Sequence, residues 1–153
     1  MTVQTRRQML ASSARVASLL AAAGFLPGIA HAAWPKAAFD TKSLADAVKA
    51  LGGGAPVASA DVTITGPDIA ENGAVVPVGI TSAIPKTESI AILIEKNPNM
   101  LAATFDIPPG TEPSLSTRVK MGQSSNIIAL VKADGKYYMA SKEVKVTLGG
   151  CGG

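Results

Sequence analysis

The sequence predicts an all-β protein, an immunoglobulin-like antiparallel β-sandwich of about seven strands. From Asp61 onward, apolar and polar residues alternate with a period of two, and β-branched residues are frequent. Turn residues such as Gly, Pro, Asn and Asp interrupt the pattern roughly every 8 to 12 positions, a spacing typical of sandwiches. No helical segment separates the strands, so the crossover that parallel strands need is missing and antiparallel pairing is favoured.

Residues 1–32 have the order of an export signal that precedes the folded domain. Arg6 and Arg7 lie ahead of the apolar run 16–26, and Ala30-His31-Ala32 fits an A-x-A cleavage site. The apolar run is shorter than the roughly 20 residues that span a bilayer as a helix. We therefore expect a twin-arginine signal peptide, cleaved after Ala32, and a periplasmic protein without a membrane anchor.

Removal of this signal changes the charge and the chemistry of the chain. The full sequence has 14 basic and 11 acidic residues, and three of the basic ones (Arg6, Arg7 and Arg15) lie in the signal, so 11 of each sign remain. A balanced chain argues against nucleic-acid binding. The only histidine, His31, leaves with the signal, so the remaining residues lack the usual catalytic triads and zinc ligands. The sequence predicts no metal site, no cofactor and no enzyme activity of its own.

Residues 33–60 are expected to contain one short helix and a linker. The segment 40–43 offers N-cap side chains, Leu44, Val48 and Leu51 recur at helical spacing, and the glycines 52–54 end the pattern. We expect this amphipathic helix to pack on the edge of the domain. The three glycines follow no strand and lack the G-x-G-x-x-G spacing, so a phosphate loop is disfavoured.

The predicted sandwich covers residues 61–148, with Asp134-Gly135 as a type I′ hairpin turn between its last two strands. Pro77 lies inside a predicted strand and indicates an edge or a bulge there. Residues 92–94 are apolar on both faces, which fits either a central strand or one covered by a partner chain. The seven predicted strands are 62–65, 74–81, 89–95, 101–106, 114–120, 126–132 and 136–148, the last bent or split near Ser141.

The final segment, 149–153, carries the only cysteine of the chain between two pairs of glycines. Glycine is flexible and has no Cβ atom, so this segment is expected to form a slender swinging arm. From Leu148 to Cys151 the chain can extend about 10 Å. In an oxidising compartment a lone cysteine indicates an intermolecular bond or a reactive thiol. The arm residues around Cys151 are Gly149, Gly150, Gly152 and Gly153.

Three segments, behind a twin-arginine signal, carry a resemblance to a known family. They are NPNMLAATF, STRVKMGQSSNIIALVKADGKYY and, above all, the terminal SKEVKVTLGGCGG. Together they resemble the SoxY family, the sulfur-substrate carrier subunits of the bacterial thiosulfate-oxidising Sox system.

This resemblance implies that Cys151 is the covalent attachment site. A c-type cytochrome complex would join it oxidatively to the sulfane sulfur of thiosulfate, giving a cysteine S-thiosulfonate. A manganese-dependent hydrolase would release sulfate, and a sulfur dehydrogenase would oxidise the remaining sulfane. The resemblance also implies a heterodimer with a second sandwich subunit, SoxZ.

Three other interpretations of the lone thiol are weaker. A structural sandwich module could dimerise through one intermolecular disulfide of Cys151. A carrier with a thiocarboxylate at a Gly-Gly end would need adenylation by ATP, and an independent thiol enzyme would need a base that the chain lacks.

The turn carboxylates Asp61, Asp68 and Glu71 match no metal-binding loop, and Ser124 and Ser125 are expected only to begin a strand.

Overall fold

A computed structural model describes residues 36–147, which fall within one unit of the chain, residues 35–153. The predicted signal peptide and the GGCGG arm lie outside the described residues. Two short helices, α2 (Lys36–Phe39) and α3 (Leu44–Ala50), precede the strands. The strands are β1 (Val57–Ala58), β2 (Val62–Thr65), β3 (Ile69–Ala70), β4 (Val76–Ser82), β5 (Thr87–Ile94), β6 (Leu101–Asp106), β7 (Ser114–Val119), β8 (Ser125–Ala133) and β9 (Lys136–Val146).

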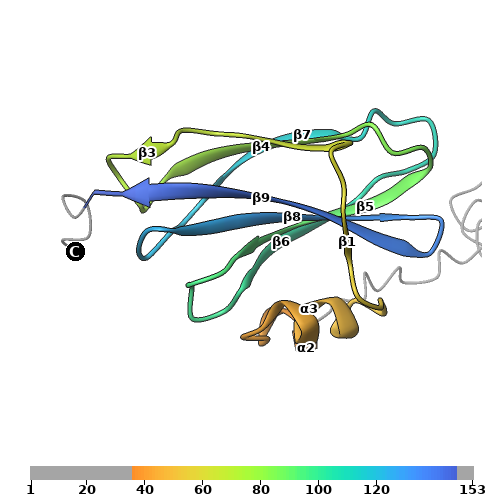
Figure 1. Ribbon diagram of the computed structural model, residues 1–153, viewed down its shortest axis with the longest axis horizontal. Helices are drawn as coiled ribbons and strands as arrows, with labels where there is room; N and C mark the ends of the chain where they lie inside the picture. The colour runs from red at the N-terminus through yellow and green to blue at the C-terminus, as the bar shows by residue number, and fades with distance from the viewer. Residues whose placement is uncertain (1–35, 148–153) are drawn as a thin grey trace, which may run out of the picture. The chain divides into compact units, whose positions relative to one another are not determined.

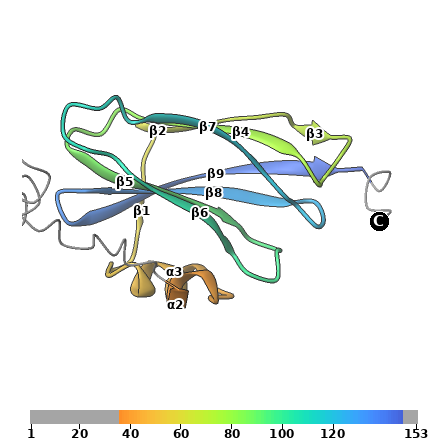
Figure 2. The same ribbon diagram turned by 180° about the vertical axis from the view of Figure 1, so that it is seen from behind.

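The strands form two sheets, which confirms the predicted all-β immunoglobulin-like sandwich. The larger sheet has the order β1-β9-β8-β5-β6, with β3 also paired to β9, and the smaller sheet has the order β2-β4-β7. Pairing is antiparallel except for β1 and β3, which both run parallel to β9. Figures 1 and 2 show the smaller sheet over one face of the larger sheet and the two helices over its other face.

Strand β5 explains why the segment 92–94 is apolar on both faces. Ile90, Ile92 and Ile94 belong to the core between the two sheets. The intervening Ala91 and Leu93 belong to a second core that includes residues of α2 and α3. Because β5 lies between β8 and β6, it is a central strand, and its second face is covered by helices of the same chain.

All seven predicted strands are present, with bounds that differ from the prediction by at most two residues. The last strand is unbroken, because Ser141 pairs with Ile128 in the middle of the β8–β9 ladder, so a split near Ser141 is wrong. The prediction missed α2, β1 and β3, of which β1 falls in the expected linker. These elements have two to four residues, too few to show a periodic pattern.

The predicted helix is confirmed as α3, but its position corrects the expectation. Ser43 is the N-cap, and its Oγ accepts a hydrogen bond of 3.1 Å from the backbone N–H of Asp46. Gly52 follows the helix with a positive φ of 83°, which glycine adopts without a Cβ clash. Val48 packs against the face of the larger sheet, so α3 is a covering layer and does not pack on the edge of the domain.

Pro77 lies in the central strand of the smaller sheet, so the whole strand is not an edge. The pairing of this strand, β4, with β2 ends at Gly79, while Pro77 itself lies opposite Arg118 of β7. At Pro77 the sheet therefore continues on one side only. Because β2 does not extend to Pro77, the absence of an N–H group on proline interrupts no backbone ladder with β2.

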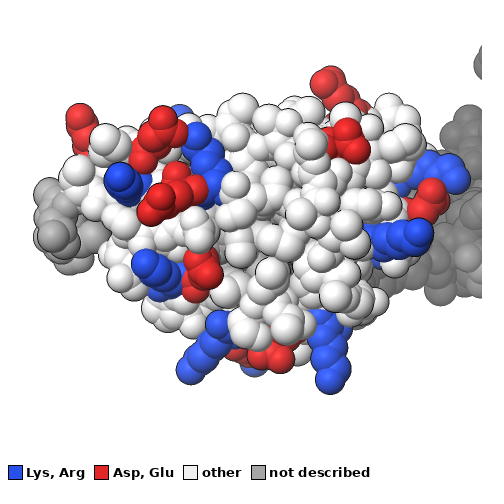
Figure 3. Space-filling view, in the orientation of Figure 1, with Lys and Arg blue, Asp and Glu red and all other residues white. Residues whose placement is uncertain are grey.

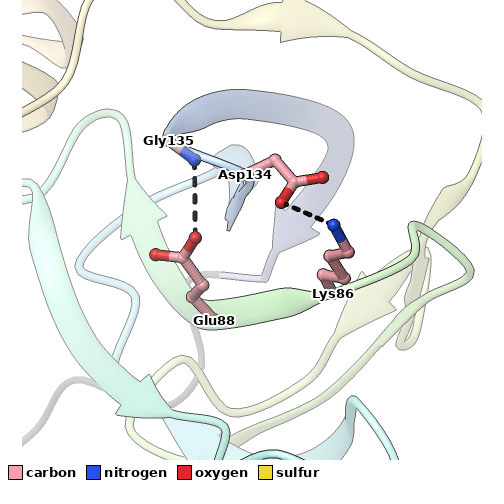
Figure 4. Close-up of polar contacts among 4 residues, drawn as sticks. All are labelled: Lys86, Glu88, Asp134 and Gly135. Carbon is pink, nitrogen blue, oxygen red and sulfur yellow. Dashed lines mark hydrogen bonds and ion pairs between the residues drawn. The ribbon is translucent and has the colours of Figure 1, made fainter.

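The hairpin between β8 and β9 has the predicted type I′ geometry, since φ is positive at both Asp134 (46°) and Gly135 (70°). Figure 4 shows the start of β5 reaching this turn: Lys86 contacts Asp134 at 3.4 Å, and the Gly135 N–H donates to Glu88 at 3.4 Å. Glu88 also pairs with Lys132 at 2.9 Å. The hydrogen bond from Lys132 is the main reason that the pKa of Glu88 is lowered. These contacts hold the start of β9.

Candidate functional site

The structure describes the base of the predicted arm and not the arm itself. Cys151 and its four flanking glycines lie outside the described residues, as do Arg6 and Arg7. What the structure does define is how the end of β9, the strand that leads toward Cys151, is held. In Figure 1, β3 and the end of β9 lie side by side at one end of the sandwich.

On one side, the short strand β3 and the residues next to it bind the end of β9. Ile69 lies opposite Lys145, and Ala70 opposite Val146. The Thr147 N–H donates to the Ala70 carbonyl at 3.0 Å, and the Thr147 hydroxyl contacts the Glu71 carbonyl at 3.3 Å. Thr147, the last described residue, is therefore anchored through both its backbone and its side chain.

On the other side, Ser124 extends the contact between β8 and β9 beyond the backbone ladder. The last ladder pair there is Ser125 with Val144. Beyond it, the Val146 N–H donates to Ser124 Oγ at 2.9 Å, and the Ser124 hydroxyl contacts the Val146 carbonyl at 3.4 Å. The sequence predicted Ser124 only as a residue at the start of a strand, and a hydrogen bond across 22 positions leaves no local signal.

A close contact with the turn before β4 also fixes the end of β9. A Cβ atom at Gly73 would meet the Met121 carbonyl oxygen and would lie 2.8 Å from Val146 Cγ1. The Met121 N–H donates to the Gly73 carbonyl at 2.7 Å, and Met121 is fully buried. Only glycine leaves room for this contact, so Gly73 allows the turn to pack directly against Val146.

The charged side chains near this end carry both signs. Lys142 Nζ lies 2.6 Å from Asp68 Oδ1, and this hydrogen bond is the main reason that the pKa of Asp68 is lowered. Figure 3 shows Lys and Arg side chains interleaved with Asp and Glu at the end of the molecule where β3 lies. The end of β9 therefore lies in no strong field of a single sign.

The described residues contain no group of three or more His, Cys, Asp or Glu side chains that could hold a metal ion. Two of the three turn carboxylates have other partners: Asp61 is bonded to Ser59, and Asp68 to Lys142. Within residues 36–147 no helix is long and apolar enough to cross a membrane.

These features define a β-sandwich protein that holds the base of a short thiol-bearing segment at the end of its last strand. The family described as "Sulfur oxidation protein SoxY" matches residues 47–151, so the match continues through Cys151. The chain belongs to the SoxY family, as the resemblance in its sequence predicted.

A solved structure agrees with this assignment. The structure of the sulfur carrier protein SoxY from Chlorobium limicola f thiosulfatophilum is 40% identical, with a TM-score of 0.62, over 67% of this chain and 94% of that chain. A superoxide reductase (neelaredoxin) from Ignicoccus hospitalis shares the fold alone: 19% identity and a TM-score of 0.50, over 56% of this chain and 79% of that chain. No curated protein sequence matches the chain.

Proposed function

We propose that this chain is a periplasmic carrier that holds thiosulfate-derived sulfur covalently on the thiol of Cys151 and presents it to partner enzymes during oxidation to sulfate. The observation that carries the proposal is the SoxY family match, which extends through Cys151. The anchored end of β9 supports it, because Thr147 is held in place and a thiol four residues beyond it can lie at most about 14 Å away.

The proposed chemistry needs only a thiol from the carrier. In loading, Cys151 and thiosulfate form one S–S bond, and one proton and two electrons are released. A c-type cytochrome would take the electrons. In hydrolysis, water attacks the sulfonate sulfur and the S–S bond to that sulfur breaks. Sulfate and two protons are released, and a persulfide anion remains on Cys151. A manganese-dependent hydrolase and a sulfur dehydrogenase would catalyse the release and the further oxidation.

The composition of the chain supports a carrier that is not itself an enzyme. The only histidine is residue 31 and the only cysteine is residue 151, so the sandwich has no thiol–imidazole pair to activate a nucleophile. We also propose export by the twin-arginine signal and pairing with a SoxZ-like sandwich subunit. A structural module that dimerises through a Cys151 disulfide is the alternative.

Intact-mass analysis of the native protein without reductant, before and after thiosulfate is supplied with the loading enzyme, tests the proposal. We expect a sulfur adduct on Cys151 that a reductant removes. Cys151→Ser should lose the adduct and all turnover, with a thermal midpoint within about 1 °C of the unchanged protein, because surface changes away from packed contacts alter stability little.

A relocated thiol provides the matched control. The double variant Cys151→Ser/Val57→Cys keeps one accessible thiol, since Val57 is 61% exposed, but places it on β1. It should react with a small alkylating reagent yet accept no sulfur from the loading enzyme. Equal loading of the relocated thiol, or a wild-type protein found only as free thiol and disulfide dimer, would show that Cys151 is not the carrier site.

A further inference from the structure

The loop between β7 and β8, residues 120–124, takes part in both restraints on the end of β9. On the inner side, Ser124 Oγ accepts the Val146 N–H at 2.9 Å. On the outer side, the Met121 N–H donates to the carbonyl of Gly73 at 2.7 Å, and Gly73 lies in the turn that follows β3. The two restraints on the base of the arm therefore meet in one loop.

Asn97, in the loop between β5 and β6, holds this loop with both ends of its side-chain amide. Its Nδ2 donates to the Lys120 carbonyl at 2.8 Å, and its Oδ1 accepts the Gly122 N–H at 3.1 Å. These two bonds lie on either side of Met121 along the chain. One side chain therefore fixes the backbone before and after the residue that contacts Gly73.

The other hydrogen bonds between the two loops hold a different part of the β7–β8 connection. Gln123 Nε2 donates to the Lys96 carbonyl at 3.3 Å, and the Lys96 N–H donates to Ser125 Oγ at 3.0 Å. In the described part of the chain, the side-chain hydrogen bonds to residues 120–122 come from Asn97. Figures 1 and 2 show both loops at the end of the sandwich where β9 ends.

The restraints on the end of β9 determine how long the arm is. With Thr147 held, four residues lead to Cys151, a distance of at most about 14 Å. The last ladder pair with β8 is at Val144, and from there seven residues lead to Cys151, a distance of at most about 24 Å. A loosened end of β9 would therefore give the thiol a longer and less defined reach.

We propose that Asn97 is a positioning residue for the arm: by fixing residues 120–122 it holds the end of β9 and so limits the length of chain that moves with Cys151. The inference rests on the proposed function, since the length of the arm matters when the thiol is delivered to enzymes. A shorter arm keeps the effective concentration of its cargo high at a bound enzyme. Asn97 acts through the loop and takes no part in the chemistry of the sulfur adduct.

Amide hydrogen exchange of the mature chain, measured by NMR, provides the first test. Asn97→Ala removes both hydrogen bonds to the loop. Asn99→Ala is the matched control, because it makes the same change at an exposed position of the same loop.

We expect the Val146 and Thr147 amides of Asn97→Ala to exchange about twentyfold faster, since each of the two lost hydrogen bonds contributes roughly a factor of five. Exchange in Asn99→Ala should stay within about twofold of the unchanged protein. Exchange at the core residues Ile92 and Val131 should also stay within about twofold, which separates a loosened base from a loss of global stability.

The distance between two spin labels provides the second test. One label is attached to Cys151 and the other to the cysteine introduced by Val57→Cys, since Val57 is 61% exposed and pairs with Tyr138 near the start of β9. In Asn97→Ala the distance distribution should gain a component about 1.3-fold as wide, because the span of a flexible chain rises with the square root of its length. Asn99→Ala should leave the distribution unchanged.

Four outcomes would overturn the role of Asn97: equal acceleration in Asn97→Ala and Asn99→Ala, equal acceleration at the core amides, faster exchange at Val146 without Thr147, or an unchanged distance distribution. Sulfur loading of unlabelled wild-type Cys151 by the loading enzyme is recorded separately. Failure to load overturns the proposed function, while exchange still decides whether Asn97 holds the base. Normal loading with unchanged exchange overturns the role of Asn97 alone.

Discussion

At the scale of single residues, Tyr137 connects the helical layer to the larger sheet. Its hydroxyl donates to the Leu51 carbonyl at 2.7 Å, and its ring lies against Gly53, where a Cβ atom would clash with it. The side chain is 6% exposed, and burial raises the pKa of its hydroxyl. The sequence identified the glycines 52–54 only as a helix stop, because the contact of Gly53 with Tyr137 depends on residues 84 positions apart.

Tyr137→Phe should lower the free energy of unfolding by about 1 kcal/mol, because the Leu51 carbonyl loses its hydrogen-bond donor. It should also change the response to alkaline pH. Since the folded protein raises the pKa of Tyr137, the tyrosine contributes stability that is complete below about pH 10 and is lost as the pH rises further. Denaturant unfolding at pH 7 and pH 11 measures both effects.

Tyr138→Phe is the control, because Tyr138 is only partly buried and packs on the core between the two sheets. If the free energy of unfolding of Tyr137→Phe declines between pH 7 and pH 11 as steeply as that of the wild-type protein, the burial of this hydroxyl does not explain the loss of stability at alkaline pH.

At the scale of elements, β9 joins the hairpin to the base of the arm. The alternating residues of β9 predicted a strand, but they did not predict that β1 and β3 would pair with the edge of β9 opposite β8. Figure 2 shows the short strands β1 and β3 near the two ends of β9. Ser124 adds a third restraint on the inner side, where the backbone ladder with β8 has ended. The end of β9 is therefore held from both sides.

Ser124→Ala should free the Val146 N–H without unfolding the sandwich. We expect amide hydrogen exchange at Val146 to become about fivefold faster, because the lost hydrogen bond contributes about 1 kcal/mol to local stability. Exchange at Thr147 should change less, since its N–H is bonded to the Ala70 carbonyl. Exchange measured by NMR tests this.

Ser124→Thr should restore slow exchange, because threonine also has a hydroxyl. An unchanged rate at Val146 in Ser124→Ala would mean that the Ser124 hydroxyl does not restrain the end of β9.

At the scale of the whole molecule, the sandwich is closed on one face by the smaller sheet and on the other by α2 and α3. This arrangement buries both faces of β5 within one chain, although its sequence also allowed a partner chain to cover it. The proposed export adds a second property of the whole protein. Removal of residues 1–32 leaves equal numbers of acidic and basic residues.

Changing Arg6→Lys and Arg7→Lys together should retain the protein in the cytoplasm as a precursor, because the export route recognises the arginine pair. The unchanged protein should be found in the periplasm with an intact mass that begins at Ala33. Cell fractionation followed by mass analysis measures both.

Arg15→Lys, which lies outside the pair, is the control and should be exported normally. Undiminished export of the double variant would contradict a twin-arginine signal.

The sequence by itself determined the features that depend on neighbouring residues. Period-two alternation predicted the seven longer strands, the Ser43 cap and Gly52 bounded α3, and Asp134-Gly135 produced the positive φ angles of a type I′ turn. The segments that resemble SoxY also indicated the family, and composition alone singled out Cys151.

Only the tertiary structure decided which segments meet. It placed β3 and Ser124 on either side of the end of β9, covered β5 with helices of the same chain, and left Ile69 of β3 exposed. The physical reason is that a two-residue strand, a serine hydrogen bond across 22 positions and an exposed side chain have no local periodicity. Each depends on residues that folding alone brings together.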